Sequence, residues 1–281
     1  MVRARADLHT HSSASDGSDS PSELIKKADA LKLGGIALTD HDSLDGIQEF
    51  MEAEASDDLK RISGLEISAE YESREVHILG YFVPLDSTPL NSRLEYLRLS
   101  RHNRLPKMIQ KLNDLGLDIS IDELYNDIVG VSSPGRPHVA QLLIKKGFVG
   151  STQEAFQKYL AHDKPGYVKK ERMQALEATK LLRSVGAIPV LAHPLTIRVQ
   201  DLLSFIETLM NVGLLGVEVD YDYRFLGIDR SADEVREIIK DLDILQTGGS
   251  DYHGTIHYTE LGGVTVSIEV IESLERIHDE L

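Results

Sequence analysis

An apolar run that ends in alternating histidines constrains the fold of this chain more than any other feature. In Asp7-Leu8-His9-Thr10-His11, polar and apolar residues alternate, which predicts a short strand. Alternate residues of a strand point to one side. Asp7, His9 and His11 should therefore lie on the same side, near the strand's end, where two imidazoles can bind one metal ion.

Similar apolar runs end in polar clusters along most of the chain. They lead to Thr39-Asp40-His41-Asp42, Glu66, His193-Pro194 and Asp251-Tyr252-His253, and one further run contains His77. Helical patterns lie between the runs, at residues 21–33, 176–185, 199–211 and 232–242. This alternation predicts an α/β fold with a largely parallel sheet, and the repeated polar strand ends favour a barrel. In such barrels the chemistry lies at the carboxyl ends of the strands.

The alternation stops between about residues 86 and 167, where every pattern is helical. We predict a helical subdomain for substrate recognition, residues 87–166, inserted into a metal-binding barrel of residues 1–86 and 167–281.

Charge and cysteine content limit the chemistry. The net charge of -16 argues against binding to duplex nucleic acid. The absence of cysteine excludes disulfides and thiolate ligands, so any metal must bind His, Asp or Glu, which suits Mn, Zn, Fe or Mg. The sequence shows no signal peptide and no membrane-spanning run. A cytoplasmic location is therefore the default expectation.

Nine side chains in these clusters are candidate metal ligands, because unrelated structural histidines have no reason to gather with carboxylates at strand ends. A single histidine after a strand is usually a hydrogen-bonded structural residue, but six of the eleven histidines fall in these clusters. Nine groups exceed one tetrahedral site and would serve two or three ions. Asp7, Asp40 and Asp42 are interpreted as acceptors that orient ligating imidazoles. The candidates are His9, His11, Asp16, His41, Glu66, His77, His193, Asp251 and His253.

A mixture of imidazoles and carboxylates suits phosphate-ester hydrolysis. Two ions ~3.5–4 Å apart can share a hydroxide and clamp the phosphoryl oxygens. We therefore predict a metal-dependent phosphoesterase.

The motifs resemble those of the PHP (polymerase and histidinol phosphatase) superfamily, in order, over nearly the whole chain. They are Asp7-x-His9-x-His11, Thr39-Asp40-His41-Asp42, Gly64-x-Glu66-Ile67, Val76-His77-Ile78-Leu79-Gly80, Ala192-His193-Pro194 and Gly249-Ser250-Asp251-Tyr252-His253. The resemblance implies a distorted, TIM-like (β/α)7 barrel that holds three ions on the nine candidates, with Mn the first choice and Zn, Fe or Mg as alternatives. The chain is most similar to the branch that acts on nucleoside 3′,5′-bisphosphates and on the 5′ ends of short oligoribonucleotides, which carries a helical insertion.

Two basic stretches in the insertion are candidates for a second phosphate site, as the resemblance also implies. Arg101 and Arg104 would be neighbours on a helix, and Arg136 would open another helix, where a helix N-terminus and a guanidinium favour an anion. The ordinary alternative is that these arginines are solvated or ion-paired. Tyr167 is a candidate for stacking on a base, although a tyrosine packed in the core or rim is more common. The expected substrate-binding residues are Arg101, Asn103, Arg104, Arg136 and His138.

The predicted reaction is attack by a metal-bridging hydroxide on a phosphate monoester, with a nucleotide or short oligonucleotide as substrate. His193, His253 and Asp251 are the expected catalytic residues; the leaving oxygen would take its proton from His193, His253 or metal-bound water. Histidinol phosphate is an alternative substrate. Weaker alternatives are a proofreading exonuclease, an amidohydrolase and a metal-dependent binding protein without turnover. The sequence does not indicate the oligomeric state.

Overall fold

The computed structural model describes residues 3–128, 135–169, 171–255 and 259–281, with only the backbone at residues 101 and 102. The chain divides into two compact units, Met1–Ser92 with Arg172–Leu281, and Arg93–Glu171. The second unit corresponds to the predicted insertion of residues 87–166, but it begins six residues later and ends five residues later.

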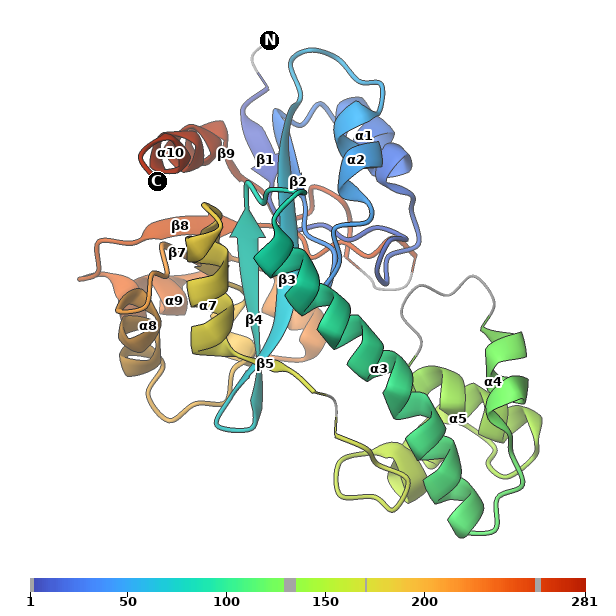
Figure 1. The fold of residues 1–281 in the computed structure, drawn as a ribbon. Coiled ribbons are helices and arrows are strands. Elements are labelled where there is room, and N and C mark those ends of the chain that lie inside the picture. Colours follow the sequence, from blue (N-terminus) through green and yellow to red (C-terminus); the bar gives the residue numbers. More distant parts are fainter. Residues whose placement is uncertain (1–2, 129–134, 170, 256–258) are drawn as a thin grey trace. The chain divides into compact units, whose positions relative to one another are not determined.

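The first unit is built around a ring of strands in the order β1, β2, β3, β4, β6, β7, β8 (Figure 1). Contacts between β1 and β8 nearly close the ring: Leu8 N–H donates to Gly248 O at 3.3 Å, and His11 N–H donates to Tyr252 O at 2.8 Å. The predicted barrel is thus confirmed. The ring strands are β1 (Arg5–Asp7), β2 (Gly35–Leu38), β3 (Lys60–Tyr71), β4 (Arg74–Tyr81), β6 (Ile188–Leu191), β7 (Gly216–Asp220) and β8 (Leu245–Gly248), with β5 (Met173–Gln174) on β3 and β9 (Val266–Ser267) on β1.

One strand of the ring runs against the others. β4 pairs antiparallel with both β3 and β6, whereas β1–β2, β2–β3, β6–β7 and β7–β8 are parallel pairs. β3 continues to Tyr71, so Glu66 lies inside this strand rather than after its end. The hairpin explains why His77 stands in the middle of an apolar run.

Helices cover the outside of the ring, and their ends follow local capping chemistry. α1 begins at Pro21, whose missing N–H costs nothing there, and Ser20 and Glu23 form a reciprocal capping box. The helices of this unit are α1 (Pro21–Ala30), α2 (Ile47–Glu52), α7 (Ala175–Ser184), α8 (Leu202–Met210), α9 (Ala232–Ile239) and α10 (Ile268–Asp279), with the short turns η2 (Pro194–Thr196) and η3 (Tyr223–Leu226).

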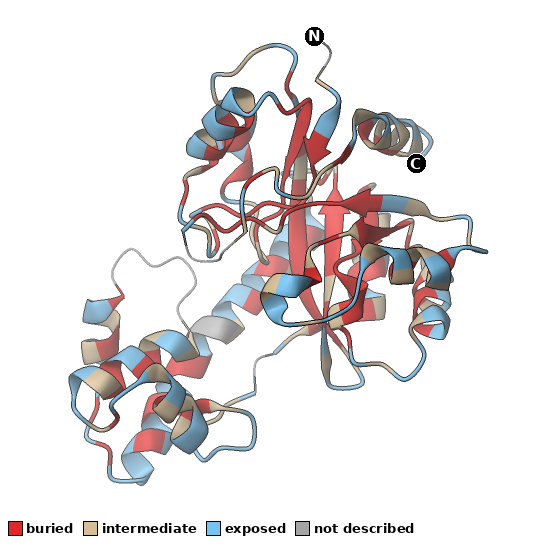
Figure 2. Ribbon diagram, turned by 180° about the vertical axis from the view of Figure 1, so that it is seen from behind, coloured by how far each residue is buried: buried red, intermediate tan, exposed pale blue. Residues whose placement is uncertain are grey.

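Apolar side chains fill the ring toward the amino ends of its strands. Ala6, Ala37, Ile62 and Val190 belong to one buried cluster, which Ile271 and Leu274 of α10 complete. Figure 2 shows the strands buried while the helices expose their outer faces. With apolar packing and α10 at that end, polar residues gather at the opposite end of the ring.

The second unit is helical and has its own core. α3 (Thr88–Asp114) leads into it, followed by α4 (Ile121–Asp127), α5 (Arg136–Lys145), α6 (Thr152–Ala155) and the π-helical turn η1 (Phe156–Leu160). Met108, Leu112, Leu124, Val139 and Leu143 are among the buried residues of this core. No helix in the described parts of either unit has the length and apolarity that a membrane crossing needs.

Candidate metal centre

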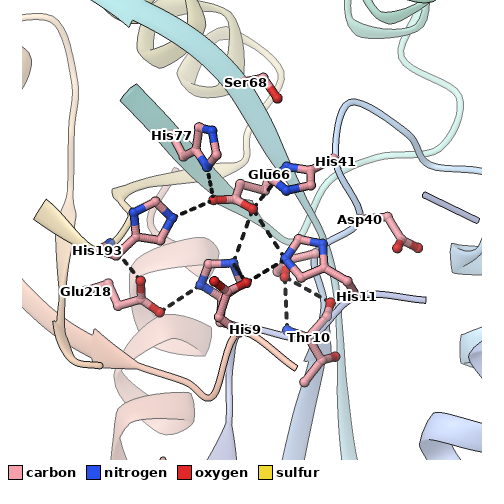
Figure 3. A network of polar contacts seen from close by, with 12 residues as sticks. His9, Thr10, His11, Asp40, His41, Glu66, Ser68, His77, His193 and Glu218 are labelled. Carbon is pink, nitrogen blue, oxygen red and sulfur yellow. Dashed lines mark hydrogen bonds and ion pairs between the residues drawn. The ribbon is translucent and has the colours of Figure 1, made fainter. Parts of the chain in front are cut away.

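The structure brings all nine candidate ligands to one end of the barrel. His9 and His11 follow β1, His41 follows β2, His193 follows β6, and Asp251 and His253 follow β8, whereas Glu66 and His77 point inward from β3 and β4. Asp16 lies on the loop after His11, and its side chain is 46% exposed. Figure 3 shows imidazoles from separate strands facing Glu66.

Glu66 is the centre of this arrangement and is completely buried. Its Oε2 lies 3.3 Å from His9 Nε2, 3.3 Å from His11 Nε2 and 3.1 Å from His41 Nδ1. Its Oε1 lies 2.8 Å from His77 Nδ1 and 3.0 Å from His193 Nε2. One carboxylate thus faces five imidazoles, and a carboxylate can bridge two ions where an imidazole cannot.

Three overlapping groups have the donors and spacing of metal sites. The ligand atoms within each group lie within 4.8 Å of one another. Glu66 belongs to two groups, and so do His11 and His41, so adjacent sites would share ligands. His193 is outside these three groups but touches Glu66. The groups are His11, Asp16, His41, His253; His9, His11, Glu66, Asp251; and His41, Glu66, His77.

Buried nitrogen atoms without partners fit bound cations. Both ring nitrogens of His11, and Nδ1 of His41, make no hydrogen bond within the described residues. Buried polar atoms normally have partners, and here the nearest carboxylate oxygens lie 3.1–3.9 Å away. Divalent ions between these nitrogens and oxygens would satisfy both.

The close carboxylates change the protonation of the metal-free cluster. Burial opposes the charge on His11, but the nearby carboxylates of Asp251 and Glu66 outweigh burial and raise its pKa to about 10. Burial likewise opposes protonation of His77, whose pKa Glu66 raises to about 9. Burial and the charges of His11 and His77 lower the pKa of His41 to about 3, against the opposing effect of Glu66. Without metal, protons therefore occupy part of the space that cations would fill.

Backbone strain coincides with two candidate ligands. His193 has φ 26° and Asp251 has φ 52°, a region in which non-glycine residues are uncommon. Such conformations cost about 1–3 kcal/mol each and cluster at functional sites. Gly249 allows the strand end before Asp251 to approach β1, since a Cβ there would lie 2.4 Å from His9 N.

Asp7 and Asp40 do not orient imidazoles, which corrects the prediction made for them. Asp7 accepts from Ser250 N–H at 2.9 Å and Ser250 Oγ at 2.6 Å, and Asp40 accepts from Ser12 N–H and Ser12 Oγ, both at 2.7 Å. Asp42 accepts from the backbone N–H of Ser68 at 2.8 Å. Asp7 and Asp40 therefore hold the main chain of the loops that carry candidate ligands, and Asp42 holds the main chain of β3.

Other side chains, which were not predicted from the sequence, orient the candidate ligands. Glu218, on β7, lies 2.9 Å from His9 Nδ1, and Thr196 Oγ1 lies 3.1 Å from His193 Nδ1. Glu75 Oε1 lies 3.4 Å from His77 Nε2. Tyr221 donates to Asp251 Oδ2 at 2.8 Å. The one signal for Glu218 is a lone carboxylate inside an apolar run.

The candidate substrate residues lie in the second unit. The side chain of Arg101 is outside the described residues, and Asn103 is exposed on α3. Arg104 and Arg136 lie near one ring, with their guanidinium carbons 5.8 and 5.7 Å from the centre of Tyr167. His138 Nδ1 accepts from Gly135 N–H at 3.0 Å and so caps α5. Two guanidiniums therefore gather at a half-buried aromatic ring.

Comparison with known families agrees with this geometry. Residues 7–242 match the model of the PHP domain. The chain belongs to the PHP domain family. The match begins at Asp7 and includes seven of the nine candidate ligands, while Asp251 and His253 follow it in the sequence.

Relatives of this PHP protein include an exoribonuclease and a phosphatase. A 5′-3′ exoribonuclease of Haemophilus influenzae is 30% identical over 267 residues, 91% of this chain and 92% of the relative. A 3′,5′-nucleoside bisphosphate phosphatase of Chromobacterium violaceum is 32% identical over 191 residues, 68% of this chain and 67% of the relative. A crystal structure named as a metal-dependent phosphoesterase of Bifidobacterium adolescentis matches with a TM-score of 0.79 at 25% identity. The match covers 97% of this chain and 96% of the chain in that structure. This PHP protein is a metal-dependent phosphoesterase that uses divalent cations.

Proposed function

We propose that this PHP protein removes the 3′-phosphate from nucleoside 3′,5′-bisphosphates and leaves nucleoside 5′-monophosphates. The gathering of nine candidate ligands around one end of the barrel, five of them imidazoles that face Glu66, supports hydrolysis of a phosphate monoester. The paired guanidiniums at Tyr167 support a substrate with a second phosphate. The name of the Chromobacterium violaceum relative gives the same class of substrate.

The nine candidates would hold two or three divalent ions, with Mn the first choice and Zn, Fe or Mg as alternatives. Such ions lower the pKa of coordinated water and neutralise charge on phosphoryl oxygens. The chain would supply ring nitrogens and the carboxylate of Glu66 to hold them, at an end of the barrel where apolar packing no longer fills the ring.

The proposed catalytic residues are His193, His253 and Asp251. His193 and His253 are buried to 8% and 4% exposure, and each directs Nδ1 at a local oxygen, Thr196 Oγ1 and Asp251 O respectively. Their Nε2 atoms therefore face the cluster. Either imidazole, when not bound to an ion, would protonate the leaving ribose oxygen.

Arg104 and Arg136 would bind the retained phosphate, and Tyr167 would lie beside the base. Arg136 donates to Leu160 O at 3.3 Å and lies 5.5 Å from the centre of the Phe156 ring. A carbonyl and aromatic faces leave its positive charge available, because neither neutralises it as a carboxylate would. Arg101, Asn103 and His138 remain proposed contacts of the same substrate.

The test is phosphate release from a substrate panel with Mn²⁺ added. The panel contains a nucleoside 3′,5′-bisphosphate, a 5′-phosphorylated dinucleotide, histidinol phosphate, AMP and an aryl phosphate. Arg136→Gln should reduce kcat/KM for the bisphosphate by at least tenfold more than for the aryl phosphate. Arg98→Gln, whose guanidinium pairs with Glu95 on the same helix, is the matched control. Equal losses on both substrates would contradict the second phosphate site.

A second candidate substrate is a short oligoribonucleotide with a 5′-phosphate. The Haemophilus influenzae relative, which matches over 91% of this chain, is named as a 5′-3′ exoribonuclease. Release of nucleotides one at a time from the phosphorylated dinucleotide, faster than phosphate release from the bisphosphate, would favour this activity. A preference for histidinol phosphate would contradict both the bisphosphatase and the exoribonuclease activity.

A further inference from the structure

β7 is the ring strand that supplies none of the nine candidate ligands, yet it touches three of them. Glu218 lies within β7, and Tyr221 directly follows it. Glu218 contacts His9 and His193, and Tyr221 contacts Asp251. We infer that Glu218 and Tyr221 are positioning residues that orient His9, His193 and Asp251 toward bound cations. This inference rests on the proposed metal ligands.

Glu218 uses both of its oxygens on different strand ends. Oε1 lies 2.9 Å from His9 Nδ1, and Oε2 accepts from the His193 backbone N–H at 2.7 Å. An acceptor at Nδ1 keeps the proton on that atom, so Nε2 is left to bind metal. The second bond holds the residue with φ 26°. One carboxylate thereby fixes a ring and a strained turn.

A packing role alone does not account for Glu218. The residue is completely buried, and burying a carboxylate is costly unless it is paired and hydrogen-bonded. An apolar residue at this position of β7 would fill the space more cheaply. A carboxylate is needed where two donors converge, because an amide accepts through one atom and donates through the other.

Tyr221 performs the corresponding task for Asp251. Its hydroxyl donates to Oδ2 at 2.8 Å, while Oδ1 lies 3.1 Å from His11 Nε2 and 3.4 Å from His9 Nε2. The phenol therefore holds Oδ2 and leaves Oδ1 facing the imidazoles. Asp251 would bind an ion through Oδ1.

The experiment uses the full chain with Zn²⁺ as the probe. Glu218→Gln should weaken the affinity of one Zn²⁺ site by about 10–100-fold, the usual effect of losing an outer partner of a ligating histidine. Long-range ¹H–¹⁵N spectra of the zinc-loaded wild-type chain should show His9 protonated at Nδ1 and metal-bound at Nε2. In the variant this single form should be lost. Thr247→Val is the control, because Thr247 lies opposite Glu218 in the β7–β8 register.

Tyr221→Phe is the milder second variant and tests the same idea if Glu218→Gln does not fold. It should also weaken one Zn²⁺ site, whereas Tyr223→Phe should not, since the Tyr223 hydroxyl contacts Leu195 N at 3.4 Å rather than a candidate ligand. Wild-type affinity and an unchanged His9 spectrum in the β7 variants would overturn the inference. If Zn²⁺ leaves the His9 signals of the wild-type chain unchanged, the proposed metal site itself fails.

Discussion

At the scale of single residues, Glu66 has the largest influence on the centre. Burial alone would raise its pKa, but the charges of His41, His77 and His9 hold it well below the usual range. Glu66→Gln removes the charge that five imidazoles face, so we expect loss of at least one ion and a fall in kcat/KM greater than the roughly 100-fold cost of losing an outer-sphere partner. Metal analysis and steady-state kinetics measure both.

Glu70→Gln is the matched control for that change. Glu70 lies on the same face of β3, four residues along, and accepts from Gln174 at 3.0 Å. We expect it to keep full metal content. A Glu66→Gln variant with wild-type metal content and activity would contradict a role for Glu66 as a metal ligand.

Protonated histidines should make the metal-free chain sensitive to alkali. The folded-state pKa values of His11 and His77, about 10 and 9, exceed the unfolded value near 6.5. Their stabilisation is therefore complete below about pH 6.5 and is lost as the pH rises through 9 and 10. Urea unfolding of chelator-treated protein should show the free energy of unfolding falling across this interval. A flat profile would contradict it.

At the scale of elements, loops are fixed by carboxylates at strand ends. Asp40 accepts from Ser12 and from Ser15 Oγ at 2.6 Å, which holds the loop that carries Asp16. Asp40→Asn places an amide donor against these donors and should lower the free energy of unfolding by roughly 1–3 kcal/mol. We expect loss of the ion nearest Asp16, with the others retained, as measured by metal stoichiometry.

Asp45→Asn serves as the control for this loop, because Asp45 is exposed and five residues from Asp40. Loss of every ion in Asp40→Asn would show general unfolding instead of a local effect.

The sequence predicted which segments form strands better than it predicted their direction. The β3–β4 turn places Glu72 and Ser73 at φ 48° and 63°, a pairing for which Asn-Gly is the usual signal. Without that signal, Glu66 resembled a residue after a strand. The candidate ligands could be predicted from the alternation of polar residues and from the strand ends alone. Glu218 was not predicted, because its role depends on which strands become neighbours in the closed ring.

At the scale of the whole molecule, bound metal should contribute much of the stability of the barrel unit. Free metal at 100 times Kd adds about 2.7 kcal/mol per site, and 1 kcal/mol corresponds to roughly 2–4 °C in a domain of 150–250 residues. Adding Mn²⁺ to chelator-treated protein should raise Tm by several degrees per site in calorimetry. Mg²⁺ and Ca²⁺ serve as comparisons, and no shift with any of the tested cations would argue against the centre.

The antiparallel hairpin has a consequence for how the centre can open. Glu66 and His77 are embedded in strands whose register runs unbroken from Gly64 to Tyr71 against Arg74 to Tyr81. Neither residue can leave without breaking this ladder, whereas Asp16 and His253 lie on loops. Amide hydrogen exchange in β3 and β4 should therefore occur only through global unfolding, even after chelation, while the loops exchange through local fluctuations.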